Sequence, residues 1–164
     1  MQGLLVSLET LRRDAVGRGG GKGANLGELL AAGLDVPPGF CCVTTAAYRR
    51  VLVEAGLAEA IDEALRDVRA DDPGWAEAAS ARITMLFEDL PLPDDLAEEI
   101  LTAYRALGAP PVAVRSSATT EDWPGASFAG QQATLLNVRG EDKLLDAVRR
   151  CWASLWSARA IAYR

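Results

Sequence analysis

The sequence contains no histidine, and this absence removes several common kinds of site. Histidine is the usual general base near neutral pH, a frequent metal ligand, and the residue that carries phosphate in phosphohistidine carriers. No histidine within the 164 residues can fill any of these roles. Any binding or catalysis must therefore use lysine, arginine, carboxylates, hydroxyl groups and backbone amides.

Long apolar runs and a disulfide framework are also missing. No segment approaches the roughly 18 apolar residues of a membrane-spanning helix. The N-terminus, MQGLLVSLETLRRDA, lacks a basic leader followed by an apolar run. Cys41, Cys42 and Cys151 make no paired set. We therefore expect a cytoplasmic chain with no membrane association and no secretion signal.

Positive charge is in the minority, with 17 Lys and Arg residues against 23 Asp and Glu and a net charge of -6. Affinity for DNA or RNA depends largely on neutralising phosphates, so the composition argues against a nucleic-acid partner. A few cations placed locally can still bind a nucleotide. The 49% hydrophobic and 24% charged residues are typical of a globular domain.

The order of sequence patterns predicts an α+β fold. Short apolar runs predict strands at 4–8, 40–45, 112–117 and 134–138, and Thr44 or Thr45 is expected to cap the helix that follows the second strand. Helical periodicity predicts helices at 25–32, 46–56, 57–68, 75–90 and 94–107, and a long last helix whose apolar stripe runs from Leu144 to Trp156. A helical insert between flanking strands, rather than alternating strands and helices, favours α+β over a doubly wound sheet.

A glycine cluster surrounds Lys22 in the segment VGRGGGKGA, residues 16–24. Glycine lets backbone amides approach a phosphate closely, and a helix beginning near Asn25 would direct its N-terminal dipole toward the same point. The segment is not a Walker loop, because Val16 and Gly23 stand where that loop has glycine and serine or threonine. Two interpretations remain: a phosphate-binding loop, or a flexible loop with a solvated lysine.

Arg115 lies in an otherwise apolar strand, and an arginine in that position needs an anionic partner. Four of the next five residues carry hydroxyl groups, namely Ser116, Ser117, Thr119 and Thr120. A polar loop that contains glycine runs from 118 to about 132. One interpretation is an anion-binding loop, and the other is an ion pair between Arg115 and Glu121 or Asp122.

The remaining candidates are assigned to structure. Tryptophans on helix faces are expected in the core, and the cysteines are expected to be buried and inert. Adjacent Glu-Asp pairs at 88–89 and 121–122 do not converge, so no metal site is predicted.

Two long blocks, GGKGANLGELLAAGLDVPPGF at 20–40 and AVRSSATTEDWPGASFAGQQATLLNV at 113–138, resemble the nucleotide-binding domain shared by phosphoenolpyruvate synthase, pyruvate phosphate dikinase and rifampicin phosphotransferase. WASLWSARAIAYR at 152–164 also fits, so the resemblance covers nearly the whole chain. One departure is Trp123-Pro124-Gly125, where the family usually has Leu-Pro followed by a polar or acidic residue.

The resemblance implies the first lobe of an ATP-grasp domain over 1–164, with 46–108 as a helical insert between flanking strands. It implies that Lys22 and Arg115 hold the phosphates of ATP, and that Gly130 and Thr134 lie against the nucleotide. The second lobe with its Mg²⁺ ligands, the phosphohistidine domain and the domain that binds the small-molecule acceptor are expected outside these residues, and the isolated chain is expected to be inactive.

In that family the β-phosphate of ATP passes through a histidine to an acceptor, with release of AMP and phosphate. Residues 23–26, 38–41 and 151–155 favour rifampicin as the acceptor, with pyruvate as the alternative. A further alternative is a non-catalytic lobe that binds a nucleotide or a partner. Its last helix, with Trp152, Trp156, Ile161 and Tyr163, would then dock on a missing lobe or another chain.

Overall fold

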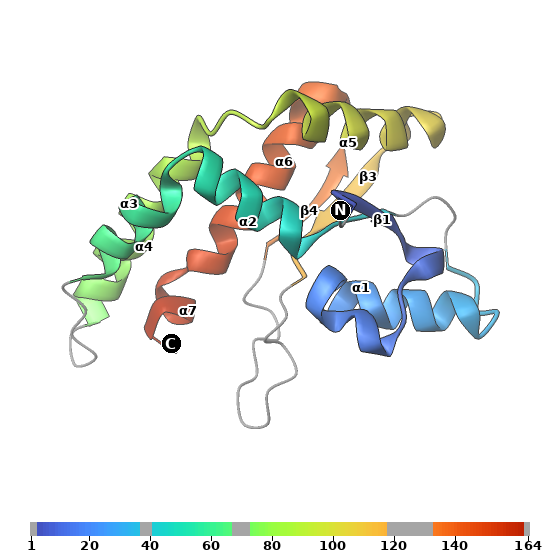
Figure 1. Ribbon diagram of the computed structural model, residues 1–164, viewed down its shortest axis with the longest axis horizontal. Coiled ribbons are helices and arrows are strands. Elements are labelled where there is room, and N and C mark those ends of the chain that lie inside the picture. The colour runs from blue at the N-terminus through green and yellow to red at the C-terminus, as the bar shows by residue number, and fades with distance from the viewer. Residues whose placement is uncertain (1–2, 37–40, 67–72, 118–132, 163–164) are drawn as a thin grey trace. The chain divides into compact units, whose positions relative to one another are not determined.

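The computed structural model describes residues 3–36, 41–66, 73–117 and 133–162, and these divide between two compact units. The first unit comprises Met1–Arg50, Pro93–Pro110 and Ser117–Ser127; the second comprises Val51–Leu92, Pro111–Ser116 and Phe128–Arg164. The elements, labelled in Figure 1 where there is room, are β1 (Leu5–Ser7), η1 (Leu8–Thr10), η2 (Arg13–Ala15), α1 (Val16–Ala31), β2 (Cys41–Val43), α2 (Thr45–Glu54), α3 (Leu57–Leu65), α4 (Pro73–Glu88), α5 (Asp94–Ala106), β3 (Val112–Arg115), β4 (Thr134–Val138), α6 (Glu141–Ala153), η3 (Ser154–Trp156) and α7 (Ala158–Ala162). Helices together with small antiparallel sheets agree with the predicted α+β class.

The first unit contains the two-stranded sheet β1–β2, in which Leu5 pairs with Val43 and Ser7 with Cys41. Its core is the cluster of Val6, Leu8 and Leu11. These are the apolar residues of the short N-terminal strand and of the turn that follows it.

Thr44 joins the end of β2 to the start of α2. Its amide donates to the carbonyl of Leu4 at 2.9 Å, which extends the pairing with the N-terminal strand. Its hydroxyl oxygen accepts from the amide of Ala47 at 3.2 Å, so Thr44 is the N-cap of α2. The structure thus selects Thr44 from the two predicted caps.

The helix α5 also belongs to the first unit. It buries Leu96, Ile100 and Tyr104, which are spaced four residues apart and so lie on one face. At its first turn Asp95 receives two hydrogen bonds from the Arg50 guanidinium, at 2.6 and 3.1 Å. The charge of Asp95 lies near the positive end of the helix dipole, which adds to the stabilisation of the carboxylate.

The core of the second unit lies where α4 packs against α6 and α7 (Figure 1). From α4 it receives Ile83 and Phe87, which are at most 1% exposed. From α6 and α7 it receives Leu144, Val148, Cys151, Trp152 and Ile161. Trp152 and Ile161 are therefore core residues, and the prediction that they form part of a docking surface is wrong; Tyr163 lies outside the described residues.

Antiparallel strands β3 and β4 form the sheet of the second unit. Val112 pairs with Val138, Val114 with Leu135 and Arg115 with Thr134. One residue of β3, Ala113, thus opposes two residues of β4, which defines a bulge, and Asn137 in the bulge has a positive φ of 55°. Asparagine is one of the few non-glycine residues that adopts this conformation readily.

The structure differs from prediction most clearly in two helices and in the burial of one cysteine. The last helix ends at Ala153 and is followed by η3 and α7, so Trp156 does not continue the stripe of Leu144 and Val148 on one helix. The helix predicted from Asn25 begins at Val16 instead. Cys41, expected in a buried strand, is exposed.

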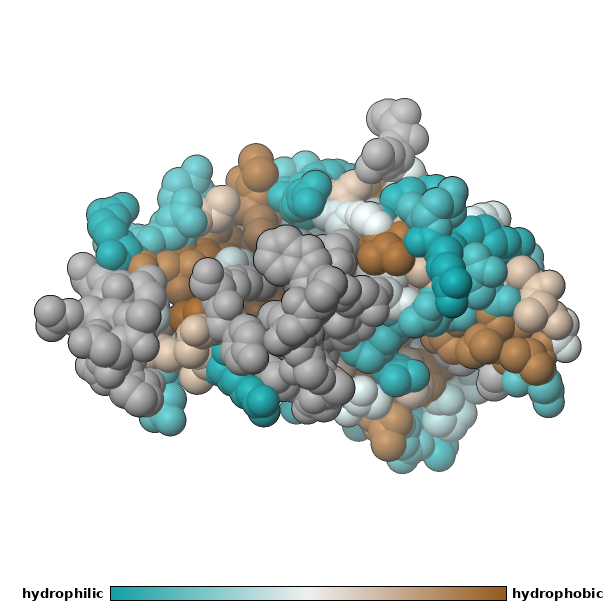
Figure 2. Space-filling view, turned by 90° about the horizontal axis from the view of Figure 1, so that it is seen from below, coloured by the Kyte–Doolittle hydropathy of each residue, from teal (hydrophilic) through white to brown (hydrophobic). Residues whose placement is uncertain are grey.

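Among the described residues no helix is long and apolar enough to cross a membrane. Outside its grey parts, the face in Figure 2 shows hydrophobic areas interrupted by hydrophilic ones. Some large apolar side chains are nevertheless well exposed, namely Leu29, Leu34, Val53, Met85 and Leu136.

Candidate functional site

Lys22 lies on a helix rather than in a glycine loop. Helix α1 is interrupted at Gly20, where φ is 69° and ψ is 171°, a conformation that is essentially restricted to glycine. The helix resumes after this break, so Lys22 falls in the first turn of its second segment. The expected helix N-terminus therefore exists, but it begins near Gly21 and not at Asn25.

Close packing explains why so many glycines occur in this helix. Gly19, Gly23 and Gly27 are spaced four residues apart and all face Leu11, which is fully buried. A Cβ atom at Gly27 would lie 2.3 Å from the carbonyl oxygen of Leu11 and 2.7 Å from that of Leu8. These three glycines thus let the helix approach the N-terminal turn, and their spacing was the signal that could have identified a helix.

Side chains from other segments satisfy backbone groups around the break. The Thr45 hydroxyl donates to the carbonyl of Gly17 at 2.7 Å. The thiol of Cys42 contacts the carbonyl of Gly19 at 3.4 Å, and the amide of Gly23 donates to the hydroxyl oxygen of Ser117 at 3.2 Å. In an unbroken helix Gly19 and Gly23 would be hydrogen-bonded to each other, so the break is accommodated by side-chain partners.

Cys42 forms part of the apolar surface beneath the second helical segment. Its Sγ lies 3.5 Å from the position that a Cβ would take at Gly19 or Gly23. Burial raises the pKa of this thiol to about 11, and the neighbouring Cys41 adds to the increase. Cys42 is therefore a neutral thiol near pH 7, which agrees with the prediction of an inert residue.

Arg115 and Thr134 are brought together by the sheet of the second unit. They are direct cross-strand partners, so their Cβ atoms are separated by about 5 Å and their side chains share one face. Both residues are exposed, as are Ala113 and Leu136, whereas the alternate positions are half-buried. Because Arg115 is exposed, burial gives no reason for an anionic partner, and the contact of Arg115 with a phosphate stays a prediction.

Ser154 holds the start of β4 and was not among the predicted site residues. Its hydroxyl accepts from the amide of Ala133 at 3.2 Å and donates to the carbonyl of Cys151 at 2.7 Å. The amide of Ser116 donates to the carbonyl of Ala133 at 3.2 Å. Because Ala133 immediately precedes Thr134, these bonds fix the backbone that carries Thr134.

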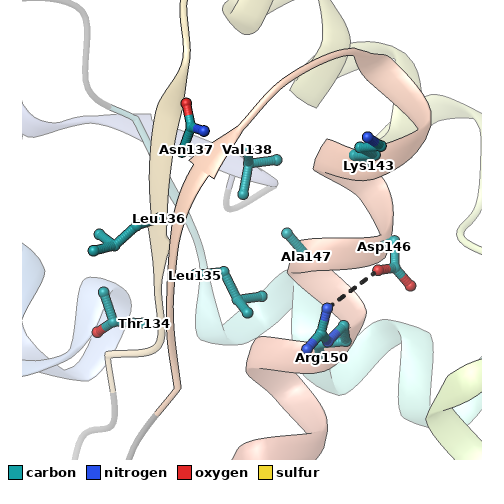
Figure 3. Close-up of a pocket in the computed structure, with 9 residues that line it drawn as sticks. All are labelled: Thr134, Leu135, Leu136, Asn137, Val138, Lys143, Asp146, Ala147 and Arg150. Carbon is teal, nitrogen blue, oxygen red and sulfur yellow. Dashed lines mark ion pairs between the residues drawn. The ribbon is translucent and has the colours of Figure 1, made fainter.

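A hollow of about 560 Å³ lies between β4 and α6 (Figure 3). Leu135 and Ala147 line it with apolar surface, and Arg150 forms an ion pair with Asp146 at 3.9 Å. Thr134 also belongs to the lining of this hollow, although Figure 3 shows its side chain directed away from α6.

Of the four residues expected to contact ATP, the sheet pairs two, Arg115 and Thr134. Lys22 belongs to the first unit. Gly130 and the loop at 118–132 lie outside the described residues, as do Glu121 and Asp122, the alternative partners for Arg115.

Comparison with known proteins gives a family match over most of the chain. The family model described as pyruvate phosphate dikinase, AMP/ATP-binding domain, matches residues 16–164. A probable phosphoenolpyruvate synthase of Methanothermobacter thermautotrophicus is 49% identical over 162 residues, which is 95% of this chain and 24% of that protein. The phosphoenolpyruvate synthase of Aeropyrum pernix is 47% identical over 168 residues, 98% of this chain and 20% of that protein.

A rifampicin phosphotransferase of Streptomyces sviceus is 46% identical over 162 residues, covering 98% of this chain and 18% of that protein. Its identity is similar to that of the phosphoenolpyruvate synthases, so a particular closeness to rifampicin phosphotransferase is not supported. The chain spans a quarter or less of the length of these relatives.

Proposed function

Because this chain belongs to the family of the pyruvate phosphate dikinase AMP/ATP-binding domain, we propose that it is the ATP-binding part of a dikinase-type phosphotransferase whose acceptor is pyruvate. The acceptor is suggested by relatives named phosphoenolpyruvate synthase at 47% and 49% identity. In the proposed reaction the β-phosphate of ATP moves to a histidine in another part of the protein and then to the enol oxygen of pyruvate. AMP and phosphate are released.

The observation that best supports ATP binding by these residues is the cross-strand pair of Arg115 and Thr134 on an exposed sheet face. A guanidinium supplies planar, permanently charged donors that suit phosphate oxygens, and a neighbouring hydroxyl adds a further donor. This donor set fits a nucleotide polyphosphate. We assign the phosphates to Arg115 and Lys22, and contacts with the nucleotide to Thr134 and Gly130.

The second contribution is the first turn of the helix that carries Lys22. Amides at a helix N-terminus and a lysine together favour a bound anion, since the helix dipole and the ammonium have the same sign there. In the proposed function residues 1–164 belong to the first lobe of an ATP-grasp domain. Mg²⁺ neutralises part of the phosphate charge and is held by carboxylates outside these residues.

The test begins with the coding sequence beyond the codon for Arg164, and with the product of the complete reading frame. ATP affinity is measured by equilibrium binding for the unmodified protein, Lys22→Met and Arg115→Met. Each substitution removes a charge-assisted contact, so we expect affinity to fall about tenfold or more. Arg82→Met is the matched control, because Arg82 is an exposed cation on α4 outside the proposed site.

Unchanged affinity in both Lys22→Met and Arg115→Met would refute the assigned roles. The acceptor is tested separately, by measuring AMP release with pyruvate and with rifampicin. Turnover with rifampicin alone would replace the pyruvate proposal with the second candidate, for which the 46% identity to a rifampicin phosphotransferase is the supporting observation. If a stop codon follows Arg164, ATP binding without turnover would favour a non-catalytic lobe.

A further inference from the structure

Ser117 contacts the break in α1 at two points, and both residues of each contact belong to the first unit. Its hydroxyl oxygen accepts from the amide of Gly23 at 3.2 Å, one residue after Lys22. At the break, a Cβ on Gly20 would lie 2.3 Å from both the carbonyl oxygen and the Oγ of Ser117. This contact therefore requires a residue without a side chain at position 20, and the positive φ of Gly20 separately favours glycine there.

The contact fixes the first helical turn after the break. Amides in such a turn have no carbonyl partner within the helix, and a serine hydroxyl is a common acceptor for them. The serine usually comes from the residue that precedes the turn, but here it lies 94 residues further along the chain. Lys22 is in the same turn as Gly23, so a bond that fixes this turn also constrains the backbone that carries the Lys22 side chain.

We propose that Ser117 is a positioning residue for Lys22, and that its hydroxyl orients the lysine toward the phosphates of ATP. This inference rests on the proposed function, in which Lys22 binds ATP. Ser117 itself need not touch the nucleotide. Since Ser117 follows Arg115 by two residues, one short segment carries a proposed phosphate ligand and the residue that orients another.

A double-mutant cycle on ATP affinity tests the proposal in the product of the complete reading frame. The variants are Ser117→Ala, Lys22→Met and the two combined. The loss of one orienting hydrogen bond is expected to weaken ATP binding about fivefold when Lys22 is present. If Ser117 acts through Lys22, Ser117→Ala should not weaken ATP binding further in the Lys22→Met background, because the ammonium group that Ser117 positions is gone.

Thr45→Ala is the matched control. It also removes a hydroxyl bonded to α1, but the bond goes to Gly17, before the break. We expect Thr45→Ala to change thermal stability without changing ATP affinity by more than about twofold. Thermal unfolding without ATP confirms that each variant is folded.

The outcomes separate the inference from the proposed function. If Lys22→Met weakens ATP binding but Ser117→Ala does not, the inference fails and the role of Lys22 stands. Equal effects of Ser117→Ala with and without Lys22 would also overturn it, because they show that Ser117 acts independently of the lysine. Unchanged affinity in Lys22→Met refutes the proposed role of Lys22 and the inference with it.

Discussion

Gly27 offers a direct test of the close packing of α1. In Gly27→Ala the new Cβ would lie 2.3 Å from the carbonyl oxygen of Leu11 and 2.7 Å from that of Leu8. Contacts shorter than 3.0 Å require movement, so the backbone must shift by at least 0.7 Å, the difference between 3.0 and 2.3 Å. Both contacts are with backbone, so no side-chain rotation can relieve them. The shift would loosen the packing around Leu11.

The expected net effect combines two opposing contributions. Overpacking of this kind costs about 1–3 kcal/mol, and the greater helix propensity of alanine returns up to about 1 kcal/mol. The difference between these ranges is about 0–3 kcal/mol, and we expect Gly27→Ala to lie near its middle, about 1–2 kcal/mol less stable than the unmodified chain. Urea unfolding followed by far-UV circular dichroism measures this difference as a lower midpoint at constant slope.

Gly17→Ala is the matched control within the same helix. No atom lies within 4 Å of the position of its Cβ, and its φ is not positive. We expect it to be neutral or to stabilise the chain by up to about 1 kcal/mol. If Gly27→Ala proved as stable as Gly17→Ala, the argument that glycine is needed at position 27 for packing would be refuted.

Three further predictions concern charge, thiol reactivity and the core. The hydrogen bond from Arg50 lowers the pKa of Asp95 below its ordinary 3.8. Asp95 should therefore stabilise the fold relative to Asp95→Asn at pH 7, and this difference should disappear as the pH falls through the lowered pKa. An equal difference in the free energy of unfolding at pH 7 and pH 2, measured by urea unfolding, would contradict this prediction. With a pKa of about 11, Cys42 is ionised in roughly one molecule in a thousand at pH 8, so mass spectrometry after alkylation should find it almost unmodified and increasingly labelled toward pH 11. Phe87→Ala should cost about 3–5 kcal/mol because Phe87 is only 1% exposed, whereas Met85→Ala, at 68% exposure, should stay within about 0.5 kcal/mol; similar unfolding midpoints for the two would refute this assignment of the core.

Sequence patterns predicted most accurately the bounds of those elements whose conformation is determined by their own residues. The strand at 134–138 has the predicted bounds, and α5 begins at Asp94 as predicted. For the strand the local signal is a β-branched or apolar run, and for α5 it is a proline before a helical pattern. Both signals agree with the packing of the fold. The resemblance to a known family likewise led to ATP, which the family match supports.

The helix around Lys22 could not be predicted in the same way. Glycine is the weakest helix former other than proline, so propensity argued for a loop at 16–24. Packing against Leu11 overrides that preference, and it depends on residues that are distant in the sequence from Gly23 and Gly27. The four-residue spacing of Gly19, Gly23 and Gly27 is a local signal for a helix, but it does not identify Leu11 as the residue against which they pack.

The roles of Ser117 and Ser154 were missed for a related reason. Each hydroxyl bonds to a backbone amide in another element, that of Gly23 or that of Ala133. A serine that caps a distant turn has the same local sequence as a serine in an ordinary loop. Only the three-dimensional arrangement within each unit distinguishes them.

The bulge in β4 has a consequence for how sequences of different length align in this strand. Leu135 and Val138 are both half-buried although they are three residues apart, because the bulge adds one residue between them. Deleting Asn137 would place Val138 two residues after Leu135, which in a regular strand is again the same face. Position 137 is therefore where an insertion or deletion can occur during evolution without reversing the inner and outer faces of β4.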